Sequence, residues 1–310
     1  MTNKFEKDIE LNEQNYSGRF SCYIGGLSLN VEHVIDAALL KAGSAEYMHF
    51  VCPASPSKAN IYINMESAVC PYDNAVESVI YKAQLFRVQT SVNGFKLIRF
   101  CNKQPQTPFL VVNTDNQFSR FHYCFYSDSD EPLIVNPYNS AADAFLLQYS
   151  FINYHGLIIH AGGGSIQGKG IVFAGTSGAG KSTLSELLSA SPNNRLYSDE
   201  RLVVRSVDEQ WNVWGTPWQG TGSIARNENA PLSALVFLRQ AGETQITQLS
   251  PSAGLHRLLQ VVSVPWYSEE WTNKGLTVCE SLIQDIPMFE LAFRPDQTAV
   301  EAVEELAVKL

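Results

Sequence analysis

Residues 1 to about 150 alternate short apolar runs with clusters of turn-forming residues. The runs are rich in aromatic and β-branched side chains and lie at 20–24, 60–64, 96–100, 109–112 and 121–126. Glycine, asparagine and aspartate separate them, as at Gly25 and Gly26. This pattern is typical of β-strands joined by tight turns. We therefore expect residues 1–150 to form a β-rich N-terminal domain, with substrate recognition as its role.

The pattern changes after residue 140. Apolar residues recur every three to four positions from 141 to 153, which predicts a helix leading into a second domain at 151–310. Short apolar strands and amphipathic helices then alternate, which favours an α/β fold. Strands are expected at 156–160, 171–174, 202–204, 210–214 and 234–238, and helices at 182–189 and 298–310. Glycine-rich segments at 162–164 and 167–170 flank a second short strand that follows the first.

A glycine-rich segment lies between the apolar run 171–174 and the helix that follows it. Glycines there let backbone N–H groups close around phosphates, and the helix N-terminus adds favourable charge. Lys181 would reach the β- and γ-phosphates, and the Ser182 hydroxyl would bind Mg²⁺. The segment has the P-loop (Walker A) pattern and predicts ATP and Mg²⁺ as cofactors. Its residues are Gly175, Thr176, Ser177, Gly178, Ala179, Gly180, Lys181, Ser182 and Thr183.

P-loop enzymes also need an acidic group for the metal or for the attacking nucleophile. The nearest carboxylates after the predicted helix are Asp199 and Glu200, which precede the apolar run 202–204. In GTPases and transport ATPases the acidic residue ends a long apolar strand, so the order in this chain is different. The pair therefore either serves the nucleotide site or forms a solvated acidic turn.

Three features together resemble the HPr serine kinase/phosphorylase family. His160 lies fifteen residues before Gly175, the P-loop follows, and the acidic pair stands within Leu196–Leu202. The resemblance covers about 156–240, with a weaker match at 286–293, and does not extend to residues 1–150. It implies that 151–310 is a P-loop kinase domain of the HPr kinase/PEP-carboxykinase-like type.

The resemblance also implies roles for single residues. Gly175 to Thr183 would hold the phosphates, with Lys181 stabilising charge during transfer. Asp199 would act as general base on the acceptor hydroxyl, Glu200 would help Ser182 to hold the metal, and His160 would lie near the reacting phosphate. The implied reaction transfers the γ-phosphoryl group to a hydroxyl of a peptide, protein or small molecule. A serine is the first candidate for this acceptor.

Some residues depart from the family pattern and keep other functions open. Thr183 stands where the HPr kinases proper have glutamate, and Glu200 replaces the second aspartate of their acidic pair. The segment 215–220 replaces a glycine-rich signature of the family and is either part of the acceptor site or a structural turn. We therefore expect a diverged branch whose acceptor is not HPr. A nucleotide-binding regulatory or scaffold protein without phosphoryl transfer, and an ATPase that drives conformational change, are the alternatives.

Composition restricts partners and location. The formal net charge is −9 over 310 residues, which argues against a broad nucleic-acid or anionic-membrane surface. The first residues lack the apolar segment of a signal peptide, and no apolar run is long enough to span a membrane. The six cysteines form no CxxC pair and no His/Cys cluster has the spacing of a zinc site, so single histidines such as His122 suggest packing only. We expect a cytoplasmic protein with no nucleic-acid or membrane partner, and the family resemblance leaves a homo-oligomer open.

Overall fold

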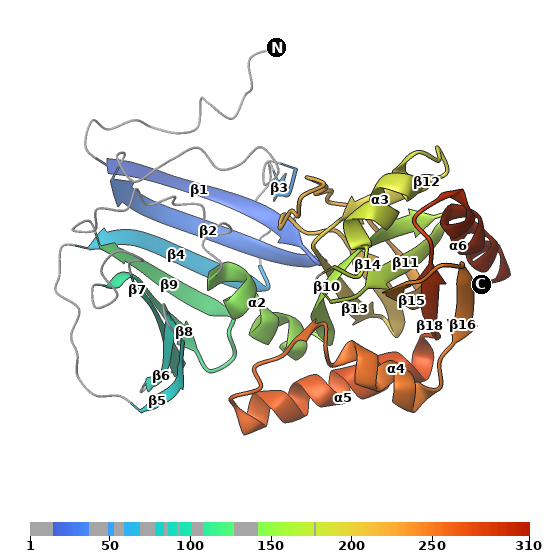
Figure 1. Cartoon of the computed structure of the whole chain (residues 1–310). Helices are drawn as coiled ribbons and strands as arrows, with labels where there is room; N and C mark the ends of the chain where they lie inside the picture. The colour runs from blue at the N-terminus through green and yellow to red at the C-terminus, as the bar shows by residue number, and fades with distance from the viewer. Residues whose placement is uncertain are drawn as a thin grey trace, which may run out of the picture. The chain divides into compact units, whose positions relative to one another are not determined.

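A computed structural model describes most of the chain (Figure 1). The described residues are 15–36, 49–52, 59–68, 78–83, 86–91, 94–100, 108–126, 142–176 and 178–310. They fall into two compact units. The first unit ends at Ser150 and leaves out the turn Ile24–Gly26, while the second unit contains that turn and Phe151–Leu310. The described residues form two nine-stranded sheets and five α-helices, so the mixed α/β class expected from the sequence is confirmed.

The first unit is built on a single sheet with the strand order β3-β1-β2-β4-β9-β8-β7-β6-β5. Pairings are antiparallel except for β2 with β4 and β4 with β9, which are parallel. The elements of this unit are β1 (Asn15–Ile24), β2 (Leu27–Asp36), β3 (Val51–Cys52), β4 (Ile61–Ala68), β5 (Val79–Lys82), β6 (Phe86–Ser91), β7 (Gly94–Phe100), β8 (Pro108–Asp115), β9 (Arg120–Tyr126) and the first part of α2 (Ala142–Asn153).

Side chains on this sheet alternate between a buried and an open face, as the period of a β-strand requires. On β4, Ile61, Ile63 and Met65 are buried, whereas the residues between them are not. Helix α2 packs on the buried face: the Tyr149 ring stacks on the Phe118 ring at 3.9 Å between centroids. Burial of each large apolar side chain stabilises the fold by about 1.5–3 kcal/mol. The opposite face keeps polar side chains in contact with solvent.

The second unit is a sheet covered by two pairs of helices. Strand β11 pairs in parallel with β15, and β15 in parallel with β18, while β10 pairs antiparallel with β11 and β13. Its elements are β10 (Gly156–Ile166), β11 (Lys169–Ala174), α3 (Lys181–Ser189), β12 (Asn194–Ser198), β13 (Arg201–Val207), β14 (Gln210–Trp214), β15 (Asn229–Gln240), β16 (Gln245–Gln248), α4 (Pro251–Leu258), β17 (Val262–Ser263), α5 (Glu269–Asp285), β18 (Met288–Phe293) and α6 (Gln297–Lys309).

Helices α3 and α6 enclose the core beside the P-loop strand. Leu184 and Leu188 of α3 and Val303 of α6 belong to one buried cluster with Phe173 of β11 and Phe293 of β18. Figure 1 shows the pair α3 and α6 on one side of the strands and the pair α4 and α5 on the other. This packing fixes the end of β11 against the start of α3, which is where the P-loop lies.

Candidate nucleotide-binding site

The P-loop joins the buried strand β11 to the first turn of α3. Gly178 and Gly180 have φ of +82° and +100°, a region that favours glycine. A β carbon on Gly180 would lie 2.7 Å from Cζ of Phe293, so a larger residue does not fit there. Thr176 and Gly178 are exposed at the outer edge of the loop, whereas Gly175 is buried and Ala179 half-buried. Ser177, expected among the phosphate-binding residues, lies outside the described residues.

Lys181 is folded back onto the loop. Its Nζ donates hydrogen bonds to the carbonyl oxygens of Gly175 at 2.7 Å and of Thr176 at 3.4 Å, and the side chain is buried. Burial lowers the pKa of Lys181, and the nearby Glu200 carboxylate acts in the opposite direction. The lysine therefore places a partly desolvated positive charge inside the curve of the loop.

Gln240, at the end of β15, is a further residue at the loop and was not singled out from the sequence. Its Nε2 donates to the carbonyl oxygen of Gly178 at 2.8 Å. A glutamine that follows an apolar strand carries no motif of its own, so the sequence offered no signal for this contact. The bond ties the tip of the P-loop to the neighbouring parallel strand.

The first turn of α3 presents two exposed hydroxyl residues, Ser182 and Thr183. Oγ of Ser182 lies 3.3 Å from Oγ1 of Thr221, a residue of the loop between β14 and β15. The hydroxyl expected to bind Mg²⁺ is thus solvent-accessible and next to a second hydroxyl. Thr221 belongs to the loop segment 215–224, which we call the 215–224 loop.

The carboxylate of Asp199, a residue between β12 and β13, binds the backbone of that loop. This residue is only 2% exposed, and its carboxylate accepts backbone N–H groups from Gly220 at 3.0 Å, Gly222 at 2.5 Å and Ile224 at 3.3 Å. A β carbon on Gly220 or Gly222 would lie 2.8 Å from an oxygen of this carboxylate. Charge-assisted bonds of this kind are about twice as strong as neutral ones. Asp199 therefore holds the 215–224 loop in place.

Glu200 points differently from Asp199 and pairs with His160. Nδ1 of His160 lies 3.3 Å from Oε1 of Glu200, and both side chains are about one-third exposed, at 31% and 33%. The pair is fixed by the register of β10 on β13, and by a bond from Ala161 N to the Glu200 carbonyl oxygen at 3.1 Å. The structure thus brings these two predicted residues together at an accessible position.

The imidazole of His160 is held in its neutral form. Burial lowers its pKa most, the positive charges of Lys181 and Arg201 lower it further, and the Glu200 carboxylate acts against them. Since the ordinary pKa of histidine is about 6.5, the ring is neutral at pH 7. Nδ1 is the ring nitrogen near the Glu200 carboxylate, and Nε2 lies on the other side of the ring.

Trp218, Arg226 and Arg201 lie in or beside the 215–224 loop and differ in their surroundings. Trp218 is buried at 9% exposure and so offers no open platform. Arg226 donates from Nη1 to the Leu196 carbonyl oxygen at 3.0 Å, which ties it to β12. Arg201 differs from these two residues. Its positive charge lowers the pKa of His160, so Arg201 lies close to that side chain.

Among the described residues, no helix has both the length and the apolar character needed to cross a membrane.

Comparison with known proteins gives one family match. A family model described as "SynChlorMet cassette protein ScmC" matches residues 142–305, more than half of the chain. No curated protein matches the chain. Similar solved structures include the Hpr(Ser) kinase/phosphatase from Coxiella burnetii, which is 12% identical over 49% of this chain and 88% of that chain, with a TM-score of 0.30. The family match includes the P-loop, His160, Asp199 and Glu200.

Proposed function

The chain belongs to the family described as SynChlorMet cassette protein ScmC, and we propose that it is a phosphotransferase that moves the γ-phosphoryl group of ATP to a hydroxyl acceptor. One observation carries the proposal: the P-loop lysine, the His160–Glu200 pair and the hydroxyls of Ser182 and Thr221 converge at the start of α3. Phosphoryl transfer needs positive charge at the phosphates and a group that orients the attacking hydroxyl.

The phosphates of ATP would bind in the P-loop. Backbone N–H groups at the N-terminus of α3 and the Lys181 ammonium supply donors and positive charge there. Lys181 now donates to the loop carbonyls, and a bound phosphate would replace these weaker acceptors with a charged one. Binding would therefore release Lys181 from the loop and turn it toward the β- and γ-phosphates.

Mg²⁺ fits the oxygen donors that the site presents. Ser182 is exposed and the Glu200 carboxylate is one-third exposed, so a hydroxyl and a carboxylate are both open to an ion from solvent. The ion would neutralise charge on the transferring phosphoryl group. P-loop enzymes that use ATP bind it together with magnesium, which makes ATP and Mg²⁺ the cofactors to test first.

The proton of the acceptor hydroxyl needs a base, and the structure distinguishes the two candidates. Asp199, the base implied by the family resemblance, is buried and its oxygens accept three N–H groups from the loop. His160 is neutral, accessible and oriented by Glu200, as a general base has to be. We therefore give His160 the role of proton acceptor, and Asp199 that of a positioning residue for the 215–224 loop.

The acceptor would be a serine-type hydroxyl on a peptide, a protein or a small molecule. The 215–224 loop borders the open side of the P-loop through the Ser182–Thr221 contact, so this loop would meet the acceptor. The description of the family as a cassette protein directs the search to the products of neighbouring genes. No nucleic-acid surface is expected at a net charge of −9.

The test is incubation with γ-labelled ATP, Mg²⁺ and proteins or peptides encoded beside the gene, with the acceptor located by mass spectrometry. We expect label on a hydroxyl residue with the native chain and none with Lys181→Met. Lys309→Met, an exposed lysine at the end of α6, is the control and should leave the label unchanged.

A nucleotide-binding regulatory protein without transfer is the second candidate. The observation that favours it is that the Asp199 carboxylate already accepts three backbone N–H groups. The base implied by the family resemblance is therefore out of reach of an acceptor hydroxyl. It predicts tight ATP binding with no labelled acceptor and no ADP. The same incubation therefore separates the two candidates.

A further inference from the structure

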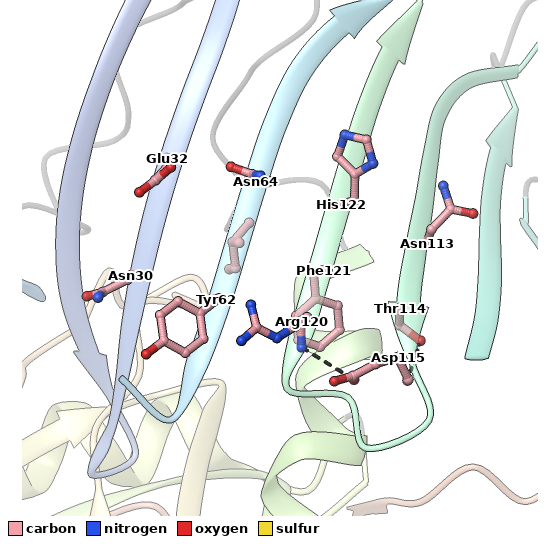
Figure 2. Close-up of a pocket in the computed structure, with 11 residues that line it drawn as sticks. Asn30, Glu32, Tyr62, Asn64, Asn113, Thr114, Asp115, Arg120, Phe121 and His122 are labelled. Atoms are coloured by element: carbon pink, nitrogen blue, oxygen red, sulfur yellow. Dashed lines mark hydrogen bonds between the residues drawn. The ribbon is translucent and has the colours of Figure 1, made fainter. Parts of the chain in front are cut away.

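The open face of the first unit's sheet carries a row of polar side chains on β4 and β9. These strands are parallel neighbours, and their register places Asn64 beside His122 and Glu66 beside Cys124. Figure 2 shows Asn64 and His122 on adjacent strands, with the polar residues of β2 on one side and those of β8 on the other. Tyr123 and Phe125, the neighbours of these residues on β9, point into the core and are buried. Two strands that are far apart in the sequence thus bring three ligand-type side chains together.

The ligand atoms of Glu66, His122 and Cys124 lie within 4.8 Å of one another. Nε2 of His122 is 3.1 Å from Oε1 of Glu66, and Sγ of Cys124 is 3.6 Å from that oxygen and 3.9 Å from Nε2. Cys124 is a free thiol and is half-buried, whereas Glu66 is exposed. The three atoms form a small triangle that opens toward solvent.

The triangle has the size of one face of a tetrahedral metal site. With bonds of about 2.1 Å to nitrogen and oxygen and about 2.3 Å to sulfur, the tetrahedral angle separates N and O by about 3.4 Å, and S from either by about 3.6 Å. The measured edges are 3.1, 3.9 and 3.6 Å, within about 0.3 Å of these values. We propose that Glu66, His122 and Cys124 bind a divalent transition metal of the zinc class.

The charges and donor types favour this class of ion. A thiolate and an imidazole select zinc-like metals over Mg²⁺ or Ca²⁺, which prefer oxygen ligands only. A thiolate and a carboxylate together balance the charge of a divalent ion. Without metal, burial and the neighbouring Glu66 raise the pKa of the Cys124 thiol to about 12, so the thiol is protonated at neutral pH. Coordination would release this proton to solvent, and binding would therefore weaken as the pH falls.

Three protein ligands leave a fourth position, as in zinc sites that bind a water or a substrate. A cavity of about 440 Å³ adjoins His122 on the same face and is also lined by Glu32, Asn64, Asn113 and Arg120. Figure 2 shows these polar groups around the cavity, with Arg120 between β4 and the end of β8. A metal beside this cavity would hold an anionic or polar ligand there. The site is separate from the P-loop and does not depend on the proposed phosphotransferase activity.

The test is titration of the metal-free full chain with Co²⁺ in the absence of nucleotide. Co²⁺ bound by a thiolate absorbs in the near ultraviolet through sulfur-to-metal charge transfer, and a tetrahedral site gives strong visible bands. We expect one Co²⁺ per chain with both features, and displacement by Zn²⁺. Cys124→Ser should remove the charge-transfer band, and His122→Gln should weaken binding more than about tenfold.

Two controls use the same residue types elsewhere in the chain. Cys279→Ser, on α5, and His256→Gln, an exposed residue of α4, should leave the Co²⁺ spectrum unchanged. Circular dichroism of each variant separates loss of the site from loss of the fold. A native chain without a charge-transfer band at stoichiometric Co²⁺ would overturn the proposal, and so would a band that survives in folded Cys124→Ser.

Discussion

The backbone N–H of Gly222 lies 2.5 Å from the carboxylate oxygen Oδ2 of Asp199. This contact joins a residue between β12 and β13 to a loop more than twenty positions further along the chain. It explains why glycines stand at 220 and 222, since a side chain at either position would meet the carboxylate. The two acidic residues therefore have different contacts: Asp199 positions the loop, and Glu200 pairs with His160.

Asp199→Asn should loosen the 215–224 loop. The amide cannot accept three N–H groups as a carboxylate does, and its own NH₂ group would face a donor. We expect faster amide hydrogen exchange at residues 220–224, and a loss of about 1.5–3 kcal/mol in the free energy of unfolding measured with urea. Asp208→Asn, in the exposed turn between β13 and β14, is the matched control and should change neither value.

The same variant distinguishes a positioning residue from a base. If Asp199 acted only as a proton acceptor, Asp199→Asn would stop phosphoryl transfer, and amide hydrogen exchange in the 215–224 loop would stay as in the native chain. That result would be incompatible with a positioning role for Asp199.

Lys181→Met should weaken binding of Mg–ATP by at least about tenfold, which corresponds to about 1.4 kcal/mol. The methionine keeps much of the apolar stem but removes the charge that now lies against the Gly175 carbonyl oxygen. Isothermal titration calorimetry measures this directly, with Lys309→Met as the control. Equal affinities of native and Lys181→Met chains would rule out a phosphate-binding role for the lysine.

Gly180→Ala should destabilise the second unit and impair ATP binding. The residue has φ of +100°, and an added β carbon would lie 2.7 Å from the Phe293 ring, so strain and overpacking act together. We expect a loss of about 1–3 kcal/mol in the free energy of unfolding. Gly242→Ala is the control, because a β carbon there meets nothing within 4 Å. Similar unfolding curves for the two variants would show that the P-loop does not require glycine at 180.

The pKa of His160 should respond to its two charged neighbours in opposite directions. Glu200→Gln removes a charge that raises the pKa and should lower it further, whereas Lys181→Met should raise it. Because the folded-state pKa lies below the ordinary value of about 6.5, the folded chain binds fewer protons than the unfolded chain just below that pH. This contribution to stability is complete above about pH 6.5 and is lost as the pH falls through the folded-state pKa.

NMR titration of the histidine ring signals, assigned with His160→Gln, measures these shifts. If the pKa moved in the same direction in Glu200→Gln and Lys181→Met, the two side chains could not act on His160 as opposite charges.

Local patterns in the sequence were enough to predict the strand and the helix that flank the glycine-rich segment. The apolar run before Gly175 and the helix after it appear as β11 and α3, with Lys181 as the first helical residue. The glycines at 162–164, in contrast, were expected to separate two short strands but lie inside one strand, β10. Glycine is needed there because neighbouring backbones approach closely: a β carbon on Gly164 would lie 2.2 Å from the Arg195 carbonyl oxygen. Close approach of strands is a tertiary property that the local sequence does not reveal.

A further feature depended on contacts between distant segments. His122 was expected to have only a packing role. The structure instead places it beside Glu66 and Cys124, and 58 positions separate Cys124 from Glu66. Motif spacing detects sites that lie within one segment, but not sites that a strand pairing assembles.

Transfer of a phosphoryl group from ATP to a hydroxyl requires that each ADP formed be matched by one phosphorylated acceptor. Both products can be quantified in a single reaction with Mg–ATP. We expect equal amounts of ADP and phosphorylated acceptor with the native chain, and neither product above background with Lys181→Met. ADP released with free phosphate and an unmodified acceptor, or ATP bound without any ADP, would show that the site does not transfer phosphoryl groups to a hydroxyl.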